Sequence, residues 1–131
     1  MKIQQSAEDY LETILIIAQR KGEVRSIDIV HELNYSKPSV SHAMKLLRES
    51  GHIEMSREGF ITLTDAGREI AEMVYERHVF LTENLIRLGV DPQVAAEDAC
   101  RIEHVISKET FSKLKEHLQK IEKLGKINQE N

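Results

Sequence analysis

Apolar residues recur every three or four positions along most of this 131-residue chain, which is the period of amphipathic α-helices. A stripe of this kind predicts a first helix over 7–21, with Ser6 as its N-cap. Two shorter stripes predict helices over 27–33 and 37–49, separated by a tight turn, with Ser36 as the N-cap of the second of them. Two short helices joined in this way predict a helix-turn-helix.

The pattern changes after the third helix, where polar and apolar residues alternate in two short runs, 52–55 and 60–63. The intervening residues, Ser56 to Gly59, have the composition of a tight turn, so this segment predicts a β-hairpin. A hairpin directly after a helix-turn-helix is typical of a winged helix. The sequence therefore predicts a winged helix-turn-helix DNA-binding domain over 1–63.

The helical period returns after this hairpin. It predicts a long helix over 65–88, a fifth helix beginning at Pro92 and a sixth that ends at Gly125. The expected fold is mainly α, with a helical domain over 64–125 and a flexible tail over 126–131. Six Gly and two Pro in the whole chain are few breakers, which agrees with a helical protein.

Composition limits where the protein acts. No apolar run reaches transmembrane length and the N-terminus lacks a signal-peptide pattern, so a cytoplasmic protein without a membrane partner is expected. The single cysteine, Cys100, has no partner in its own chain for a disulfide and is expected to be reduced. The net charge of −4 is unusual for a DNA-binding protein, although bound divalent cations would move it toward zero.

The strongest chemical signal is a thiol, a carboxylate and an imidazole at positions i, i+3 and i+4 of the fifth helix, which share one helix face. The first helix offers two carboxylates three residues apart, and the long helix offers one histidine. Such a set suits Fe²⁺, Mn²⁺, Co²⁺ or Zn²⁺. Taken singly, the two acids could serve the helix dipole and the histidine could be a core residue. The candidate metal ligands are Asp9, Glu12, His78, Cys100, Glu103 and His104.

The sequence does not favour an enzyme. It contains no Gly-rich phosphate loop, no His-Glu-x-x-His helix and no nucleophile elbow. Cys100 and His104 could form a thiolate–imidazolium pair, but no oxyanion hole or substrate pocket accompanies them. The alternative function is a winged-helix regulator that senses a small organic ligand, or an oxidant through Cys100, without metal.

The segment 98–107 resembles the metal-binding helix of the diphtheria-toxin-repressor-like family of iron- and manganese-dependent transcriptional repressors. The resemblance begins at Ser6 and continues to the sixth helix, without the SH3-like domain of longer members. It implies a homodimer that binds Fe(II) or Mn(II) as corepressor, with Co, Ni or Zn as possible substitutes, and then binds a palindromic double-stranded DNA operator of metal-uptake genes. It also implies that the six candidate ligands hold the metal, and that the helical domain over 64–125 is the metal-binding and dimerisation domain.

Two positions separate the subgroups of this family. Iron-responsive members tend to have Met and Cys at the positions of Asp9 and Cys100, whereas manganese-responsive members have Asp and Glu. This chain combines Asp with Cys. The resemblance therefore implies either metal, and the thiol leans slightly toward iron.

The resemblance also assigns DNA reading to the outward face of the third helix. Small hydroxyls there suit phosphates and thymine methyl groups, and a lysine suits a phosphate or a guanine edge. A metal that joins the two halves would hold the recognition helices of a dimer about 34–36 Å apart, one turn of B-DNA. The expected DNA-binding residues are Arg25, Ser36, Lys37, Pro38, Ser39, Ser41, His42, Lys45 and Arg57.

Overall fold

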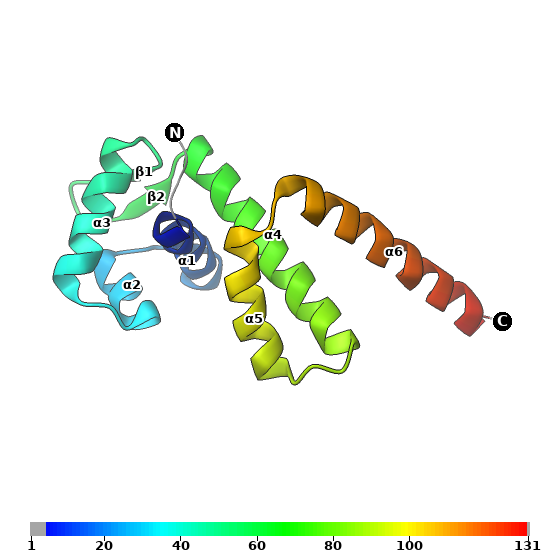
Figure 1. Ribbon diagram of the computed structural model, residues 1–131. Helices are drawn as coiled ribbons and strands as arrows, with labels where there is room; N and C mark the ends of the chain where they lie inside the picture. The colour runs from blue at the N-terminus through cyan, green and yellow to red at the C-terminus, as the bar shows by residue number, and fades with distance from the viewer. Residues whose placement is uncertain (1–4, 131) are drawn as a thin grey trace. The chain divides into compact units, whose positions relative to one another are not determined.

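The computed structural model describes residues 5–130, with side chains described for 5–125 (Figure 1). Its elements follow in the order α1 (Gln5–Lys21), α2 (Ser26–Leu33), α3 (Lys37–Glu49), β1 (Ile53–Met55), β2 (Ile61–Leu63), α4 (Asp65–Arg87), α5 (Pro92–Val105) and α6 (Lys108–Glu130). This order confirms the predicted mainly α fold with an N-terminal winged helix-turn-helix. The chain forms two compact units that divide within α4, between Tyr75 and Glu76.

The first unit is built around one apolar core. α2 packs on α3, and α1 packs against α2, α3 and β2. Each large side chain that this packing removes from water contributes about 1.5–3 kcal/mol to folding. The residues that are almost completely buried here include Leu11, Ile14, Ile17, Val24, Ile29, Val40, Met44, Ile53 and Ala71.

The turn of the helix-turn-helix is fixed by local chemistry. Asn34 ends α2 in the left-handed conformation, with φ 56°, which Asn tolerates better than most residues. The Ser36 hydroxyl then accepts a hydrogen bond from the backbone N–H of Ser39 at 3.3 Å and caps α3. The predicted cap of the third helix is therefore confirmed.

The hairpin is a two-stranded antiparallel sheet in which Ile53 lies opposite Leu63. The backbone N–H of Ile61 donates to the carbonyl of Val24 at 2.8 Å, so the segment before α2 is hydrogen-bonded to β2. The guanidinium carbon of Arg25 lies 4.2 Å from the ring centroid of Phe60, a cation–π distance. These contacts join the wing to the start of α2.

Two helix ends differ from the sequence prediction. Ser6 lies within α1 and is not its N-cap, because the helix already includes Gln5 and no breaker precedes Ser6 in the described residues. α6 continues through Gly125 to Glu130, since one interior glycine costs about 1 kcal/mol and does not by itself break a long helix. The predicted flexible tail, 126–131, falls on residues whose side chains lie outside the described part of the chain.

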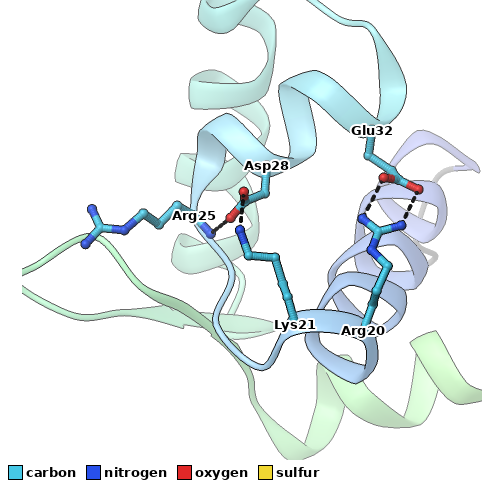
Figure 2. Close-up of polar contacts among 5 residues, drawn as sticks. All are labelled: Arg20, Lys21, Arg25, Asp28 and Glu32. Carbon is cyan, nitrogen blue, oxygen red and sulfur yellow. Dashed lines mark hydrogen bonds and ion pairs between the residues drawn. The ribbon is translucent and has the colours of Figure 1, made fainter.

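Ion pairs join the C-terminal end of α1 to α2 (Figure 2). The Arg20 guanidinium donates to both carboxylate oxygens of Glu32, at 2.8 and 3.4 Å. Lys21 Nζ lies 2.8 Å from Asp28 Oδ1, while Asp28 Oδ2 accepts from the backbone N–H of Arg25 at 2.9 Å. The hydrogen bond from Arg20 lowers the pKa of Glu32, and the hydrogen bond from Lys21 lowers the pKa of Asp28.

Because these pKa values are lowered, the fold is expected to lose stability at acidic pH. A carboxylate whose folded pKa lies below its unfolded value stabilises the fold above the unfolded pKa and loses that effect as pH falls through the folded pKa. Replacing Asp28 with Asn should therefore lower the urea midpoint at pH 7, and this difference should shrink as pH falls below 3.8, the ordinary value for Asp. A difference that is equal at pH 7 and pH 3 would contradict the prediction; Glu54→Gln on the hairpin is the matched control.

The second unit contains the C-terminal half of α4 with α5 and α6. Asp91 caps α5 by accepting hydrogen bonds from two backbone N–H groups, and Ser107 caps α6 by accepting from Thr110 at 3.0 Å. The rings of Phe80 and Phe111 meet edge to face with centroids 5.4 Å apart, which packs α4 against α6. No helix within residues 5–130 is long and apolar enough to cross a membrane.

Candidate functional site

α5 presents the thiol, carboxylate and imidazole together, as their spacing predicted. One ligand atom from each of Cys100, Glu103 and His104 lies within 4.8 Å of the other two. Glu103 is completely buried, whereas Cys100 is exposed. The three side chains therefore form a compact donor set that reaches from the interior to the surface of the second unit.

α4 adds His78 to this set. Its Nδ1 lies 2.9 Å from Oε2 of Glu103, within hydrogen-bond distance. The apolar stripe around His78 in the sequence is more often typical of a hydrogen-bonded core histidine than of a ligand, and the structure gives this histidine a carboxylate partner. Three of the six predicted ligands, His78, Cys100 and His104, thus gather around the buried carboxylate of a fourth, Glu103.

The carboxylate of Glu103 has one oxygen available for a cation. Within residues 5–125, Oε1 accepts no hydrogen bond, although Nε2 of His104 lies 3.3 Å away. A buried carboxylate oxygen without a hydrogen bond is costly unless a cation or a donor satisfies it. Carboxylate, imidazole and thiolate donors together suit a divalent transition-metal ion. The residues present therefore fit the metal that the sequence suggested.

The two remaining predicted ligands, Asp9 and Glu12, belong to the first unit. They stand three residues apart on α1 and so share one side of that helix. Glu12 is buried and Asp9 is half-buried. α1 is the helix that the ion pairs of Figure 2 join to the helix-turn-helix.

All nine predicted DNA-binding residues are accessible. Seven of them lie at the start of α3 and along its outer side, and together they form what we call the reading face. The other two, Arg25 and Arg57, lie at the start of α2 and in the wing turn. The apolar residues of α3, including Val40 and Met44, point into the core. The exposed residues of the reading face are Ser36, Lys37, Pro38, Ser39, Ser41, His42 and Lys45.

Two further exposed residues lie beside the reading face and were not among the predicted DNA-binding residues. Arg48 follows Lys45 by three positions, a spacing that places both cations on one side of α3 and could have revealed it. Tyr35 immediately precedes the Ser36 cap and is 46% exposed. Its ring meets that of the buried Tyr10 edge to face, with centroids 5.9 Å apart. α1 therefore contacts the turn that leads into the reading face.

Comparisons with known proteins agree with both halves of this description. Residues 2–59 match the family model "Iron dependent repressor, N-terminal DNA binding domain". Residues 64–129 match the model "Iron dependent repressor, metal binding and dimerisation domain".

Individual relatives support the same family. The chain is 35% identical over 113 residues to the transcriptional regulator MntR of Escherichia coli strain CFT073, covering 86% of this chain and 73% of that protein. It is 34% identical to an uncharacterised HTH-type transcriptional regulator of Methanocaldococcus jannaschii, covering 88% of this chain and 94% of that protein.

A solved structure supports both the fold and the family. The chain is similar to a manganese-dependent transcriptional repressor in complex with manganese, with a TM-score of 0.77 and 28% identity. The match covers 86% of this chain and 52% of that one, so the chain spans about half the length of this structure. The comparisons confirm the predicted assignment as a regulator and not an enzyme. The chain belongs to the iron-dependent repressor family, the diphtheria-toxin-repressor-like family of metal-dependent transcriptional regulators.

Proposed function

We propose that this protein is a cytoplasmic transcriptional repressor that binds Fe(II) or Mn(II) as corepressor and then binds a palindromic operator of metal-uptake genes as a homodimer. The observation that carries this proposal is the buried Glu103, which lies between two imidazoles and beside a thiol. A winged helix with an accessible reading face supports the DNA-binding part. The family-model match to a metal-binding and dimerisation domain supports the dimer.

The proposed ligands are the four side chains of the second unit together with Asp9 and Glu12, which the family motif adds from α1. A bound divalent cation supplies positive charge that offsets repulsion among the carboxylates. Glu103 contributes a carboxylate already fixed by His78, and Cys100 contributes a soft donor at the exposed end of the set.

The first unit contains the contacts through which metal binding would affect the DNA-reading helix. Restraining α1 through Asp9 and Glu12 also restrains α2, because Arg20 is ion-paired with Glu32. α2 packs on α3, which carries the reading face. Coupling between two binding events of this kind is typically worth about 1–3 kcal/mol. The metal therefore favours the arrangement of the winged helix that fits the operator.

Selection of DNA from a random pool by the Mn²⁺-loaded protein tests the proposed target. The enriched sequences should be inverted repeats whose half-sites are centred roughly 10 base pairs apart, the geometry of two recognition helices on one face of B-DNA. Enrichment of sequences without two-fold symmetry would contradict a homodimeric reader.

Comparing Fe²⁺, under anaerobic conditions, with Mn²⁺ tests the metal. Thiolate donors favour softer ions, and divalent-ion affinities generally rise from Mn²⁺ to Fe²⁺. We therefore expect Fe²⁺ to half-saturate operator binding at a lower concentration than Mn²⁺. The chain is similar in structure to a manganese-dependent transcriptional repressor, so a reversed order would assign this chain a manganese response.

Lys45 provides a test of the reading face. Replacing it with Ala should weaken operator binding and reduce the slope of log affinity against log salt by about 1, the effect of losing one phosphate contact. The matched control is Lys113→Ala on α6, an exposed lysine outside the reading face. Unchanged affinity and salt slope in Lys45→Ala would remove Lys45 from the reading face.

A further inference from the structure

Arg77 is a buried cation next to the candidate metal centre that the proposed ligand set does not use. Its side chain comes from α4, and the residue is only 8% exposed. Nη1 donates to the carbonyl oxygen of Glu103 at 3.1 Å and to that of Ile106 at 3.0 Å. The guanidinium carbon lies 5.4 Å from the ring centroid of Phe111 on α6. Arg77 therefore contacts both helices that follow α4.

The two carbonyl groups lie at the C-terminal end of α5, where backbone oxygens lack partners within the helix. A guanidinium is permanently charged, and its hydrogen bonds to carbonyl oxygens are stronger than those of a neutral donor. The positive charge also suits the negative end of the helix dipole. Arg77 thus fixes the position and rotation of the last turn of α5.

This last turn carries two of the proposed metal ligands, Glu103 and His104. Adjacent residues of α4 contact Glu103 in two ways, since Arg77 binds its backbone carbonyl and His78 binds its carboxylate. Glu103 is therefore held at its backbone and at its carboxylate, which leaves its side chain little freedom to change conformation. Metal sites require such support, because ligands have to stay within about 0.5 Å of the productive geometry.

We propose that Arg77 is a positioning residue of the metal centre, which holds the Glu103 backbone so that its carboxylate faces the cation. Arg77 is not a ligand and acts only through Glu103 and the end of α5. This inference rests on the proposed function, because it assumes that Glu103 binds a metal. It adds a residue from α4 that no ligand motif contains.

Co²⁺ is a suitable probe, because its visible absorption bands report the geometry of the ligands around it. Replacing Arg77 with Met keeps a long side chain and removes every donor. The expected result is a roughly 10–100-fold weaker affinity for Co²⁺, the usual effect of losing an outer-shell partner, together with shifted absorption bands. Arg77→Lys should recover only part of the affinity, because an ammonium group can also donate to carbonyls but ends one bond short of the position of Nη1.

The matched control is Arg87→Met, which removes an exposed cation of the same helix that pairs with Glu122. Its affinity for Co²⁺ and its bands should equal those of the unchanged protein. If Arg77→Met binds Co²⁺ with unchanged affinity and bands, the positioning role is overturned while the proposed function stands. If the unchanged protein binds no Co²⁺, Fe²⁺ or Mn²⁺, both proposals are overturned.

Circular dichroism of the metal-free variants separates positioning from folding. If Arg77→Met does not fold, Arg77→Lys decides, because it preserves the buried positive charge. A folded Arg77→Lys protein with weaker affinity and shifted bands supports the proposal, and one indistinguishable from the unchanged protein overturns it.

Discussion

Replacing Glu103 with Gln should abolish metal-dependent DNA binding and weaken Mn²⁺ or Fe²⁺ affinity by more than about 100-fold. Loss of an outer-shell partner already costs about 10–100-fold, and Glu103 is the buried carboxylate at the centre of the proposed ligand set. Gln has nearly the same shape and can still accept a hydrogen bond, but it carries no negative charge for a cation. Calorimetric titration with Mn²⁺ measures the effect directly.

The control for this variant is Glu97→Gln, which removes an exposed carboxylate from the same helix. Its affinity for Mn²⁺ should not change. In the metal-free state, Glu103→Gln should unfold close to the temperature of the unchanged protein, because a neutral amide is less costly to bury than a carboxylate. The increase in Tm that metal gives the unchanged protein should be missing from the variant. Retained Mn²⁺ affinity would exclude Glu103 as a ligand.

Replacing Gly67 with Ala should strongly destabilise the winged helix. A Cβ atom at this position would lie 2.0 Å from the carbonyl oxygen of His52. That oxygen also accepts a hydrogen bond from the backbone N–H of Thr64 at 3.1 Å. The hydroxyl of Thr64 donates a second hydrogen bond, to the carbonyl of Gly51 at 2.7 Å. The start of α4 is thereby fixed against the start of β1, and neither backbone can move away without losing these bonds.

We expect Gly67→Ala to cost about 3 kcal/mol, the upper part of the range for overpacked sites, and to lower Tm by roughly 10 °C. The control is Gly125→Ala in α6, where a Cβ meets no atom of the described residues within 4 Å. That change should be neutral or should stabilise by about 0.5–1 kcal/mol, because Ala favours helix over Gly. Urea unfolding of both variants measures the difference. Equal stabilities of the two would show that α4 tolerates a Cβ against β1.

Sequence reasoning predicted the features that depend on local chemistry. The Ser36 cap, the hairpin and the shared face of Cys100, Glu103 and His104 all follow from spacing within one element. Helix ends were less predictable. At Ser6 a good capping residue lies inside α1, and at Gly125 a helix breaker lies inside α6, because continued helical hydrogen bonding outweighs a single residue's preference.

The features that were missed depend on contacts between distant parts of the chain. Arg77 reaches carbonyl groups 26 and 29 positions later, and neither the spacing nor the composition around it signals that use. The tight approach of Gly67 to His52 likewise results from how α4 meets the hairpin. The sequence raised the possibility that His78 is a ligand, but only the structure shows which atom of it lies near Glu103.

The affinity of the chelator-treated protein for a selected palindromic DNA, measured with and without Mn²⁺ or Fe²⁺ at fixed salt, tests the central claim most directly. A coupling of about 1–3 kcal/mol predicts DNA binding that is roughly 5–150-fold tighter with metal than without it. By linkage, saturating DNA should tighten metal binding by the same factor. Equal DNA affinity with and without either metal would contradict a metal-dependent repressor.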